Sequence, residues 1–222
     1  MVARGDLGIE CPLEELPVIQ RRAVKTCFHH GRPVIIATHM LESMIGSPMP
    51  TRAEITDVAN AVYERADCFM LSGETAVGRY PFEGVAVLDK ITRRIERETP
   101  ADFVPPAHLQ GDKLRLLQSA VQFANQLQGS ALLTFTRQGF MATNLAAMRP
   151  AFAPIFAFTH SVETLRQLRL LRATEPFLIS LASEPNETIE RAIAILRRDG
   201  RIQPGDRMVI RTPTRSYTSN YG

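Results

Sequence analysis

Three short polar segments carry the side chains in this sequence that are best suited to chemistry. They are RGDLG at residues 4–8, THMLES at 38–43 and SGETAVG at 72–78, and each directly follows a short apolar run. The Asp6 carboxylate suits a hard divalent cation such as Mg²⁺, which takes oxygen ligands and keeps several waters. The backbone N–H groups of Gly5 and Asp6 suit a carboxylate or phosphate oxygen, because glycine lets the main chain approach closely. Capping of a helical turn is the structural alternative for Asp6.

Hydroxyl groups follow the second and third of these apolar runs. Thr38 ends the second run, so its hydroxyl would point into the same ligand space as a donor or a proton relay. Capping of the turn that follows is the alternative for Thr38. Ser72 opens a Ser-Gly turn of the kind that forms an anion nest, a feature that many purely structural turns share. His39 lies beside Thr38, and a single loop histidine is more often a hydrogen-bonded surface residue than a base.

Strands and helices alternate through the first hundred residues, and this order brings the three segments together. Apolar runs at residues 1–3, 33–38 and 67–71 predict buried strands. Helices are predicted over residues 14–30 and onward from Thr51, where TRAE is a capping box, and from Pro81. Alternating βα units favour a parallel sheet or barrel, in which ligands bind at the carboxyl ends of the strands. We therefore expect all three polar segments on one side of the sheet.

A second α/β region follows a stretch of different character. Residues 99–111 (TPADFVPPAHLQG) hold three prolines and a glycine without periodicity, which is typical of a linker. We therefore expect one domain over residues 1–98 and another over 112–222. In the second domain, apolar runs predict strands and the 3.6-residue period predicts helices. The predicted strands are 131–135, 154–159, 177–182 and 206–212, and the predicted helices are 112–127, 140–148, 162–171 and 187–197.

Composition narrows the class of protein. The 222 residues carry a net charge of only +3 and no block of Lys and Arg with interleaved aromatics, so nucleic acid is not an expected partner. No apolar run approaches the ~20 residues that span a bilayer, so a membrane is not expected either. The cysteines Cys11, Cys27 and Cys68 form no metal-binding pair. Without a signal peptide, they predict reduced thiols in a cytoplasmic protein.

The polar segments and their flanking runs resemble one known family. MVARGDLGIE, PVIIATHMLESMIGSPMPTRAEITDVANAV and ADCFMLSGETAVGRYPFEGV are similar to the last three βα units of the pyruvate kinase barrel. The resemblance runs without a gap from Met1 to about Glu98, and the second domain resembles the C-terminal α/β domain of that family more loosely. It implies an α/β fold with a partial (β/α)8 TIM barrel, the last three βα units, followed by a separate three-layer α/β domain.

The resemblance also implies a reaction and a role for each site residue. The reaction is phosphoryl transfer from phosphoenolpyruvate to ADP, the last step of glycolysis, in a homotetramer that uses Mg²⁺ and K⁺. By resemblance, Asp6 is a Mg²⁺ ligand, and the backbone of Gly5 and Asp6 receives the substrate carboxylate. Thr38 contacts the substrate beside the enolate carbon that is protonated, and Ser72 belongs to a proton-relay network. These roles fit phosphoryl transfer, which depends mainly on positioning and charge neutralisation.

Other parts of the family's site have no counterpart in this sequence. By resemblance, the chain begins at the sixth of eight βα units, so the catalytic Lys, a second metal-binding Glu, the substrate-binding Arg, the K⁺ ligands and the lid domain lie upstream. Asp6 by itself is a poor Mg²⁺ site, and three strands do not close a barrel. We therefore expect the portion by itself to be inactive.

Two positions depart from the family's pattern. His39 stands where the family usually has Gln. In effector-regulated members a Ser/Thr-Gly-rich phosphate loop follows the first strand of the second domain, and here that stretch is TFTRQGFMATN. Thr134, Thr136 and Arg137 are candidate ligands for an effector phosphate, although Gln138 and Phe140 weaken the pattern.

Two other classes of function compete with an enzyme segment. The chain could be a truncated, non-catalytic relative that acts as a regulatory or assembly module. A stand-alone α/β ligand-binding protein is the third hypothesis, and it requires the three-unit half to be covered by a second copy. An assay of pyruvate formation, on this chain and on a longer one, separates the first hypothesis from the others.

Overall fold

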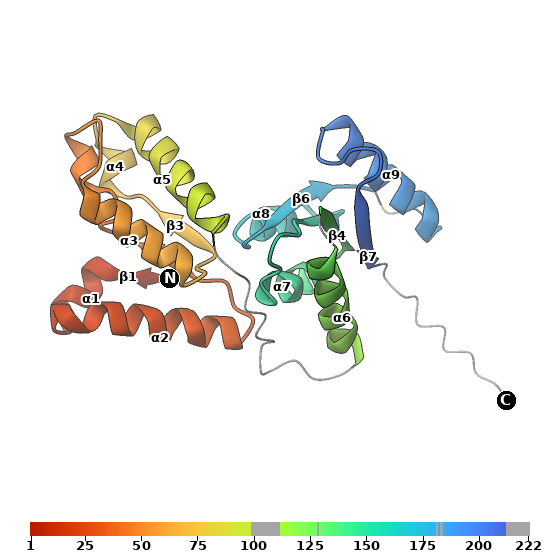
Figure 1. The fold of residues 1–222 in the computed structure, drawn as a ribbon, viewed down its shortest axis with the longest axis horizontal. Helices are drawn as coiled ribbons and strands as arrows, with labels where there is room; N and C mark the ends of the chain where they lie inside the picture. The colour runs from red at the N-terminus through yellow and green to blue at the C-terminus, as the bar shows by residue number, and fades with distance from the viewer. Residues whose placement is uncertain (99–111, 128, 181, 183, 212–222) are drawn as a thin grey trace. The chain divides into compact units, whose positions relative to one another are not determined.

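The computed structural model describes residues 1–98, 112–127, 129–180, 182 and 184–211. The chain divides into two compact units, Met1–His108 and Leu109–Gly222. In the described residues of both units, strands alternate with helices and pair in parallel (Figure 1), which confirms the predicted parallel α/β class. The linker predicted at residues 99–111 lies outside the described residues.

The first unit is built on a three-stranded sheet in the order β1-β2-β3. Val2 pairs with Ile36, and Ile35 pairs with Cys68, so the three parallel strands have their carboxyl ends at one edge. The strands are β1 (Val2–Ala3), β2 (Ile35–Ala37) and β3 (Cys68–Met70). The helices are α1 (Arg4–Glu10), α2 (Leu16–His29), α3 (Arg52–Tyr63), α4 (Gly73–Ala76) and α5 (Pro81–Glu96), with 3-10 turns η1 (Leu13–Glu15) and η2 (Glu42–Ile45).

The helix ends of this unit follow local signals in the sequence. At the start of α3, Thr51 Oγ1 accepts the Glu54 N–H at 3.3 Å, and the Glu54 carboxylate accepts the Thr51 N–H at 2.7 Å. This pair confirms the predicted capping box. Helix α2 is followed by Gly31 with a φ of 61°, which glycine adopts without strain. Helix α5 begins on Pro81, because the first turn of a helix needs no N–H partner.

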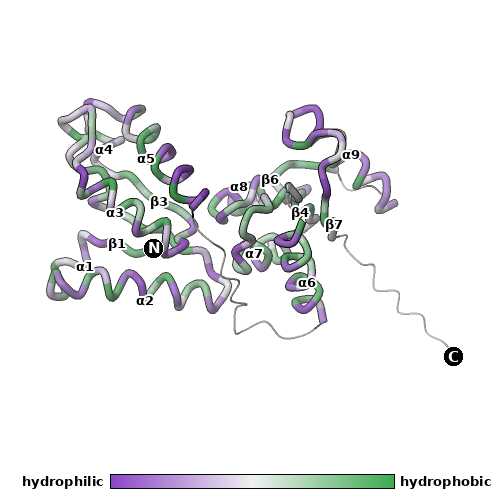
Figure 2. The backbone as a smooth tube through the Cα atoms, viewed as in Figure 1, coloured by the Kyte–Doolittle hydropathy of each residue, from purple (hydrophilic) through white to green (hydrophobic). Residues whose placement is uncertain are grey.

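The core of the first unit lies between the sheet and helices α2, α3 and α5. Ile36 of β2 and Val58 of α3 have no exposed surface, and Val24 of α2 is almost completely buried. Leu88 and Ile91 of α5 pack against the same cluster. Figure 2 shows hydrophobic and hydrophilic stretches alternating along α2, as a helix with one buried face requires.

The second unit has a four-stranded parallel sheet in the order β6-β5-β4-β7. Ala131, Leu133 and Phe135 of β4 pack with Ala192 and Leu196 of α9 on one face. Leu132 is buried too but points to the other face, where α6 and α7 contact β4, so helices cover both faces. The strands are β4 (Ser130–Phe135), β5 (Ile155–Thr159), β6 (Thr174–Leu178) and β7 (Arg207–Arg211), and the helices are α6 (Asp112–Gln126), α7 (Phe140–Ala147), α8 (Val162–Leu168) and α9 (Pro185–Arg198).

Several elements differ from those that the sequence predicts. The strand predicted at 177–182 is found at Thr174–Leu178 and contains Pro176. A proline is tolerated there because β6 is an edge strand of the sheet, whereas a central strand would exclude it. The helix predicted at 162–171 ends at Leu168. Helix α1 begins directly after β1, where the sequence pattern predicts no helix. Among the described helices, none has both the length and the apolar character needed to cross a bilayer.

Candidate active site

Hydrogen bonds join the three predicted polar segments at the carboxyl ends of β1, β2 and β3. The Gly5 N–H donates to Thr38 Oγ1 at 2.7 Å, which links the first segment to the second. The Leu41 N–H donates to Glu74 Oε1 at 3.0 Å, which links the second segment to the third. The three segments therefore form one connected rim on one side of the sheet, as the order of strands and helices predicts.

Arg4 holds this rim together, although its sequence context predicts no role for it. Its guanidinium donates to the carbonyl oxygens of Thr38 at 2.8 Å and His39 at 2.9 Å. The same group donates to both carboxylate oxygens of Asp57 on α3, at 2.8 and 2.7 Å. Arginine suits this task because its planar fork presents several donors in fixed directions. The Arg4 side chain is only 11% exposed, and its bonds to Asp57 and to the Thr38 carbonyl are partly buried.

Thr38 and His39 have backbone conformations that are costly for their residue types. Their φ angles are 70° and 54°, in the left-handed region that a β-branched residue such as threonine rarely adopts. Such a conformation costs of order 1–3 kcal/mol and persists where neighbouring contacts over-determine it. The Arg4 and Gly5 hydrogen bonds supply such contacts. Strain of this kind is concentrated at functional sites, which favours this turn as part of one.

The Thr38 hydroxyl is already used inside the chain. It donates to the Ala37 carbonyl at 2.6 Å and accepts the Gly5 N–H at 2.7 Å. An oxygen atom of the chain therefore already occupies the position at the Gly5 amide that was predicted for a substrate oxygen.

Asp6 is exposed and lies in the first turn of α1. The N-cap of this helix is Ala3, and no side chain caps it, so the alternative interpretation of Asp6 as a helix cap is wrong. Within the described part of the chain, no hydrogen bond or ion pair engages its carboxylate. Asp6 thus fits as one hard oxygen ligand for Mg²⁺. No group of three or more His, Cys, Asp or Glu residues gathers into a metal site among the described residues.

The turn after β3 contains its own anion. The Ser72 N–H, a predicted donor to a bound anion, donates to Glu74 Oε2 at 2.8 Å. The Glu74 side chain is 2% exposed and fills this nest. Ser72 Oγ is buried, and no described residue hydrogen-bonds to it. A buried hydroxyl without a partner is uncommon, and a role for Ser72 in a proton relay stays a prediction.

A hollow of about 360 Å³ opens beside Arg4, between α2 and α3. Its charged groups are largely paired inside the chain, since Gln20 Nε2 donates to Glu64 at 2.8 Å and Arg4 is bound to Asp57. His39 reaches its edge and lies 3.9 Å from the Glu42 carboxylate, a surface position that fits the ordinary interpretation of a loop histidine. The residues that line the hollow are Arg4, Leu13, Leu16, Pro17, Gln20, Arg21, His39, Asp57, Asn60 and Glu64.

The three candidate effector-phosphate residues of the second unit differ in exposure. Thr134 has no exposed surface, and no described residue hydrogen-bonds to its Oγ1, so it cannot reach a bound phosphate unless its neighbours move. Thr136 is 6% exposed, and Arg137 is exposed. An effector-phosphate role for Thr136 and Arg137 stays a prediction.

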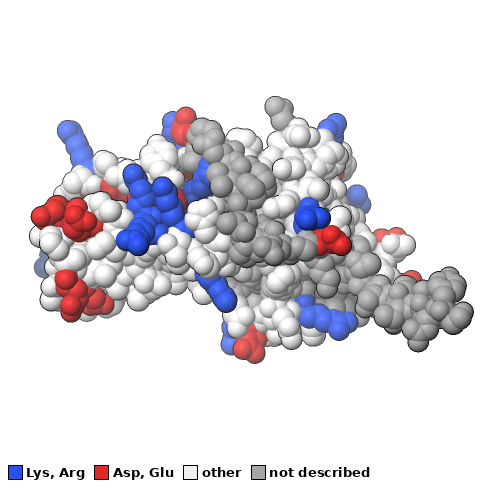
Figure 3. Space-filling model, turned by 90° about the horizontal axis from the view of Figure 1, so that it is seen from below, with Lys and Arg blue, Asp and Glu red and all other residues white. Residues whose placement is uncertain are grey.

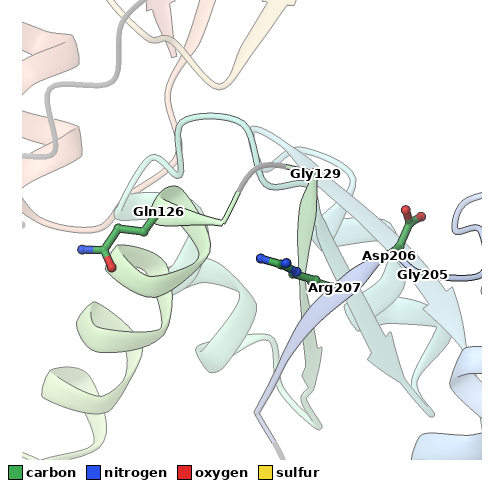
Figure 4. Close-up of a pocket in the computed structure, with 5 residues that line it drawn as sticks. All are labelled: Gln126, Gly129, Gly205, Asp206 and Arg207. Carbon is green, nitrogen blue, oxygen red and sulfur yellow. The ribbon is translucent and has the colours of Figure 1, made fainter.

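The second unit has a hollow of its own, at the end of the sheet away from the candidate effector-phosphate residues. It has a volume of about 430 Å³ and lies at the amino ends of β4 and β7 (Figure 4). Asp206 and Arg207 line it, and Asp206 already accepts the Gln203 N–H at 2.7 Å. Open parallel sheets bind ligands at the carboxyl ends of their strands, so we assign no ligand to this hollow.

Comparison with known proteins decides what this rim belongs to. A family model described as pyruvate kinase, barrel domain, matches residues 1–85, and one described as pyruvate kinase, alpha/beta domain, matches residues 115–220. The chain belongs to the pyruvate kinase family. Pyruvate kinase 2 of Synechocystis is 39% identical over 218 residues, which are 96% of this chain and 36% of that protein.

Two further relatives agree. The pyruvate kinase of Mycobacterium tuberculosis is 40% identical over 212 residues, which are 95% of this chain and 44% of that protein. The crystal structure of a pyruvate kinase from Cryptosporidium parvum matches with a TM-score of 0.86 and 36% identity, covering 94% of this chain and 43% of that one. The chain therefore spans between 36% and 44% of the length of these three relatives.

Proposed function

We propose that this chain supplies the last three βα units and the C-terminal α/β domain of a pyruvate kinase, which transfers a phosphoryl group from phosphoenolpyruvate to ADP. The observation that carries the proposal is the connected rim, where the Gly5 amide meets the Thr38 hydroxyl at 2.7 Å beside the exposed Asp6 carboxylate. Parallel α/β folds place their active sites at this edge. The first unit accordingly represents part of a barrel, and the protein is proposed to act as a homotetramer in the cytoplasm.

Each rim residue has a defined task in this proposal. Asp6 is one protein ligand of Mg²⁺, which when bound neutralises phosphate charge and stabilises the enolate oxygen. The N–H groups of Gly5 and Asp6 receive the substrate carboxylate. For that to happen the Thr38 hydroxyl must turn away from the Gly5 amide, and the turn frees the same hydroxyl to contact the substrate. We assign no residue of this chain to K⁺.

Ser72 acts in the second half of the reaction. After phosphoryl transfer the product is an enolate, whose C=C electron pair forms a new C–H bond to give pyruvate. The proposed proton donor is the relay that contains the Ser72 hydroxyl, which regains a proton from solvent. The absence of a hydrogen-bond partner for Ser72 Oγ among the described residues supports this role, because the group is not committed to the fold.

A hybrid enzyme tests the proposal directly. This chain replaces the matching segment of the Mycobacterium tuberculosis pyruvate kinase, and pyruvate formation from phosphoenolpyruvate and ADP is measured with Mg²⁺. We expect an active hybrid and a loss of about a hundredfold or more for Asp6→Asn, because a metal ligand is removed. Asp89→Asn, an exposed carboxylate on α5, serves as the control and should keep the activity.

The contrary outcomes are equally clear. A folded hybrid without activity would overturn the proposal and favour the regulatory or assembly module. Equal activity of the hybrid and its Asp6→Asn variant would remove Asp6 from the metal site. The 222-residue chain by itself is expected to form no measurable pyruvate, and activity there would contradict that part of the proposal.

A further inference from the structure

Glu74 is a buried carboxylate to which the proposed reaction gives no task. Its side chain is 2% exposed, and no described residue forms an ion pair with it. Burying a carboxylate without a cation is costly unless hydrogen bonds satisfy its oxygens. Here both oxygens accept backbone N–H groups, from Leu41 at 3.0 Å and from Ser72 at 2.8 Å.

A purely local role explains only one of these bonds. A glutamate in the first turn of a short helix commonly reaches back to a preceding N–H, as Glu74 does to Ser72. The other oxygen crosses to Leu41, which lies 33 positions earlier in the chain and belongs to the rim segment after β2. A single carboxylate therefore fixes the backbone of one rim segment against the backbone of the other.

The surrounding contacts keep these two segments close. A Cβ on Gly73 would lie only 3.0 Å from Ile45 Cδ1, so the start of helix α4 packs closely against the Ile45 side chain of the turn η2. The Arg79 N–H also donates to the Ile45 carbonyl at 2.9 Å. Among these contacts, the Glu74 carboxylate is the one that accepts the Ser72 N–H, so it holds the backbone from which the Ser72 hydroxyl projects.

We propose that Glu74 is a positioning residue that sets the Ser72 hydroxyl against the Thr38–Leu41 turn for protonation of the enolate. The proposal rests on the proposed function, because it assigns Glu74 to the same proton-transfer step. It predicts a specific defect. When Glu74 is changed, phosphoryl-transfer substrates still bind, but the proton donor is misplaced.

The geometry of the clamp is tested first, on the whole 222-residue chain and without any activity assay. Glu74→Gln leaves one carbonyl oxygen to serve two N–H groups, and Glu74→Asp keeps the charge but is one methylene too short to reach both. In each variant we expect the Leu41 or the Ser72 amide to exchange with deuterium about tenfold faster or more. Amides within α3 should stay unchanged, and Glu83→Gln, an exposed glutamate of α5, should change neither.

The catalytic part is tested in the active hybrid enzyme. Glu74→Gln should lower kcat by about 10–100-fold and leave the KM for phosphoenolpyruvate within about twofold, because only proton transfer is affected. Exchange of pyruvate methyl hydrogens with solvent deuterium, the reverse of enolate protonation, should fall by the same factor. Ser72→Ala should produce the same defect, and the double variant should be no worse than Ser72→Ala, because both changes act on one hydroxyl.

Each contrary result overturns a distinct statement. Unchanged exchange at Leu41 and Ser72 would show that Glu74 does not clamp the two segments. Additive losses for Glu74→Gln and Ser72→Ala, or a raised KM with normal methyl exchange, would show that Glu74 does not act through Ser72. Unfolding of both Glu74 variants where Glu83→Gln stays folded would show a structural role only. An inactive parent hybrid would overturn the proposed function and the catalytic part, while the exchange experiment would still decide the clamp.

Discussion

The Arg4 guanidinium donates from Nη1 to both carboxylate oxygens of Asp57, although 53 positions separate the two residues in the chain. This pair ties the end of β1 to the middle of α3. The remaining donors of Arg4 reach the carbonyl oxygens of Thr38 and His39. Both residues have positive φ angles, and these hydrogen bonds help to stabilise that conformation. One side chain thus couples the packing of a helix to the shape of the rim turn.

Arg4→Lys should destabilise the first unit. Lysine keeps the charge but cannot direct donors to Asp57 and to two carbonyl oxygens at once. We expect the free energy of unfolding to fall by about 1–3 kcal/mol, since partly buried acceptors lose charged donors. Urea denaturation, monitored through amide exchange in α3, measures this loss of stability. Arg93→Lys, which alters an exposed pair with Asp89 on a single helix, is the control and should give no measurable change.

Much of the fold is predictable because its signals are local. The capping box of Thr51 and Glu54 involves residues three positions apart, and the glycine after α2 marks the end of that helix without reference to the rest of the chain. The strand β6 begins earlier than the sequence predicts because the signal that decides its start is not local. Whether a proline is tolerated depends on the edge position of β6, which only the tertiary structure defines.

The site is predictable in part for the same physical reason. The order of βα units is enough to place Gly5, Thr38 and Ser72 at one rim. Arg4 and Glu74 lie close to these residues in the sequence, but their partners lie 53 and 33 positions away. Contacts between residues so far apart in the chain can be recognised only once the tertiary structure is known. An acidic residue such as Glu74 would ordinarily be assigned to the surface, and its burial is the signal that the sequence lacks.

Charge offers little guidance to the location of a site on this chain. Figure 3 shows basic and acidic side chains in small groups of both signs on the face that it presents. The net charge of +3 is small for 222 residues. The candidate site is therefore defined by the hydrogen bonds at the strand ends and not by a broad electrostatic field.

Gly78→Ala tests how tightly the turn after β3 is packed. A Cβ at this position would lie 2.3 Å from the Glu74 carbonyl oxygen, a backbone atom that cannot move aside without shifting α4. We expect a loss of about 2 kcal/mol or more in the stability of the first unit, measured by urea denaturation. Gly46→Ala is the matched control, because nothing lies within 4 Å of its added Cβ. Equal effects of the two changes would contradict the packing of this turn.

The stability of the first unit should fall in acid through Glu54. Burial acts to raise the pKa of this carboxyl, but hydrogen bonds donated by Ser43 and Thr51 outweigh it and lower the pKa below its usual range. An acid with a lowered pKa in the folded state stabilises the fold above its unfolded pKa and loses this contribution as the pH falls through the folded value. The contribution of Glu54 should therefore be full at neutral pH, begin to fall below the ordinary glutamate pKa of about 4.3, and be lost as the pH falls through the lower pKa of the folded state.

Urea denaturation of the unchanged chain and of Glu54→Gln, at several pH values from acid to neutral, measures this effect. The variant should be less stable at neutral pH, and the two proteins should converge as the pH falls. Glu83→Gln, which also removes a carboxylate from the first turn of a helix, reports the general effect of that charge. A difference between the unchanged chain and Glu54→Gln that grows in acid would contradict the hydrogen-bonding account.

Thr134→Val should stabilise the second unit. Thr134 has no exposed surface, and its hydroxyl has no hydrogen-bond partner among the described residues, so the fold carries the full cost of removing that group from water. Valine replaces the hydroxyl with a methyl group in a strand that suits β-branched residues. We expect a gain of about 1 kcal/mol in urea denaturation followed by amide exchange in β5.

The neighbouring strand offers a matched comparison for this change. Thr159 is also completely buried, but its Oγ1 accepts the Ser161 N–H at 3.3 Å. Thr159→Val should therefore destabilise the unit by about 1 kcal/mol, because a backbone donor loses its acceptor. Both substitutions replace a buried threonine with valine, so they change volume and polarity equally. If one raises the stability and the other lowers it, the difference comes from the hydrogen bond of the hydroxyl. Destabilisation by Thr134→Val would mean that its hydroxyl does bind a partner, and loss of phosphate binding in that variant would return Thr134 to the candidate effector site.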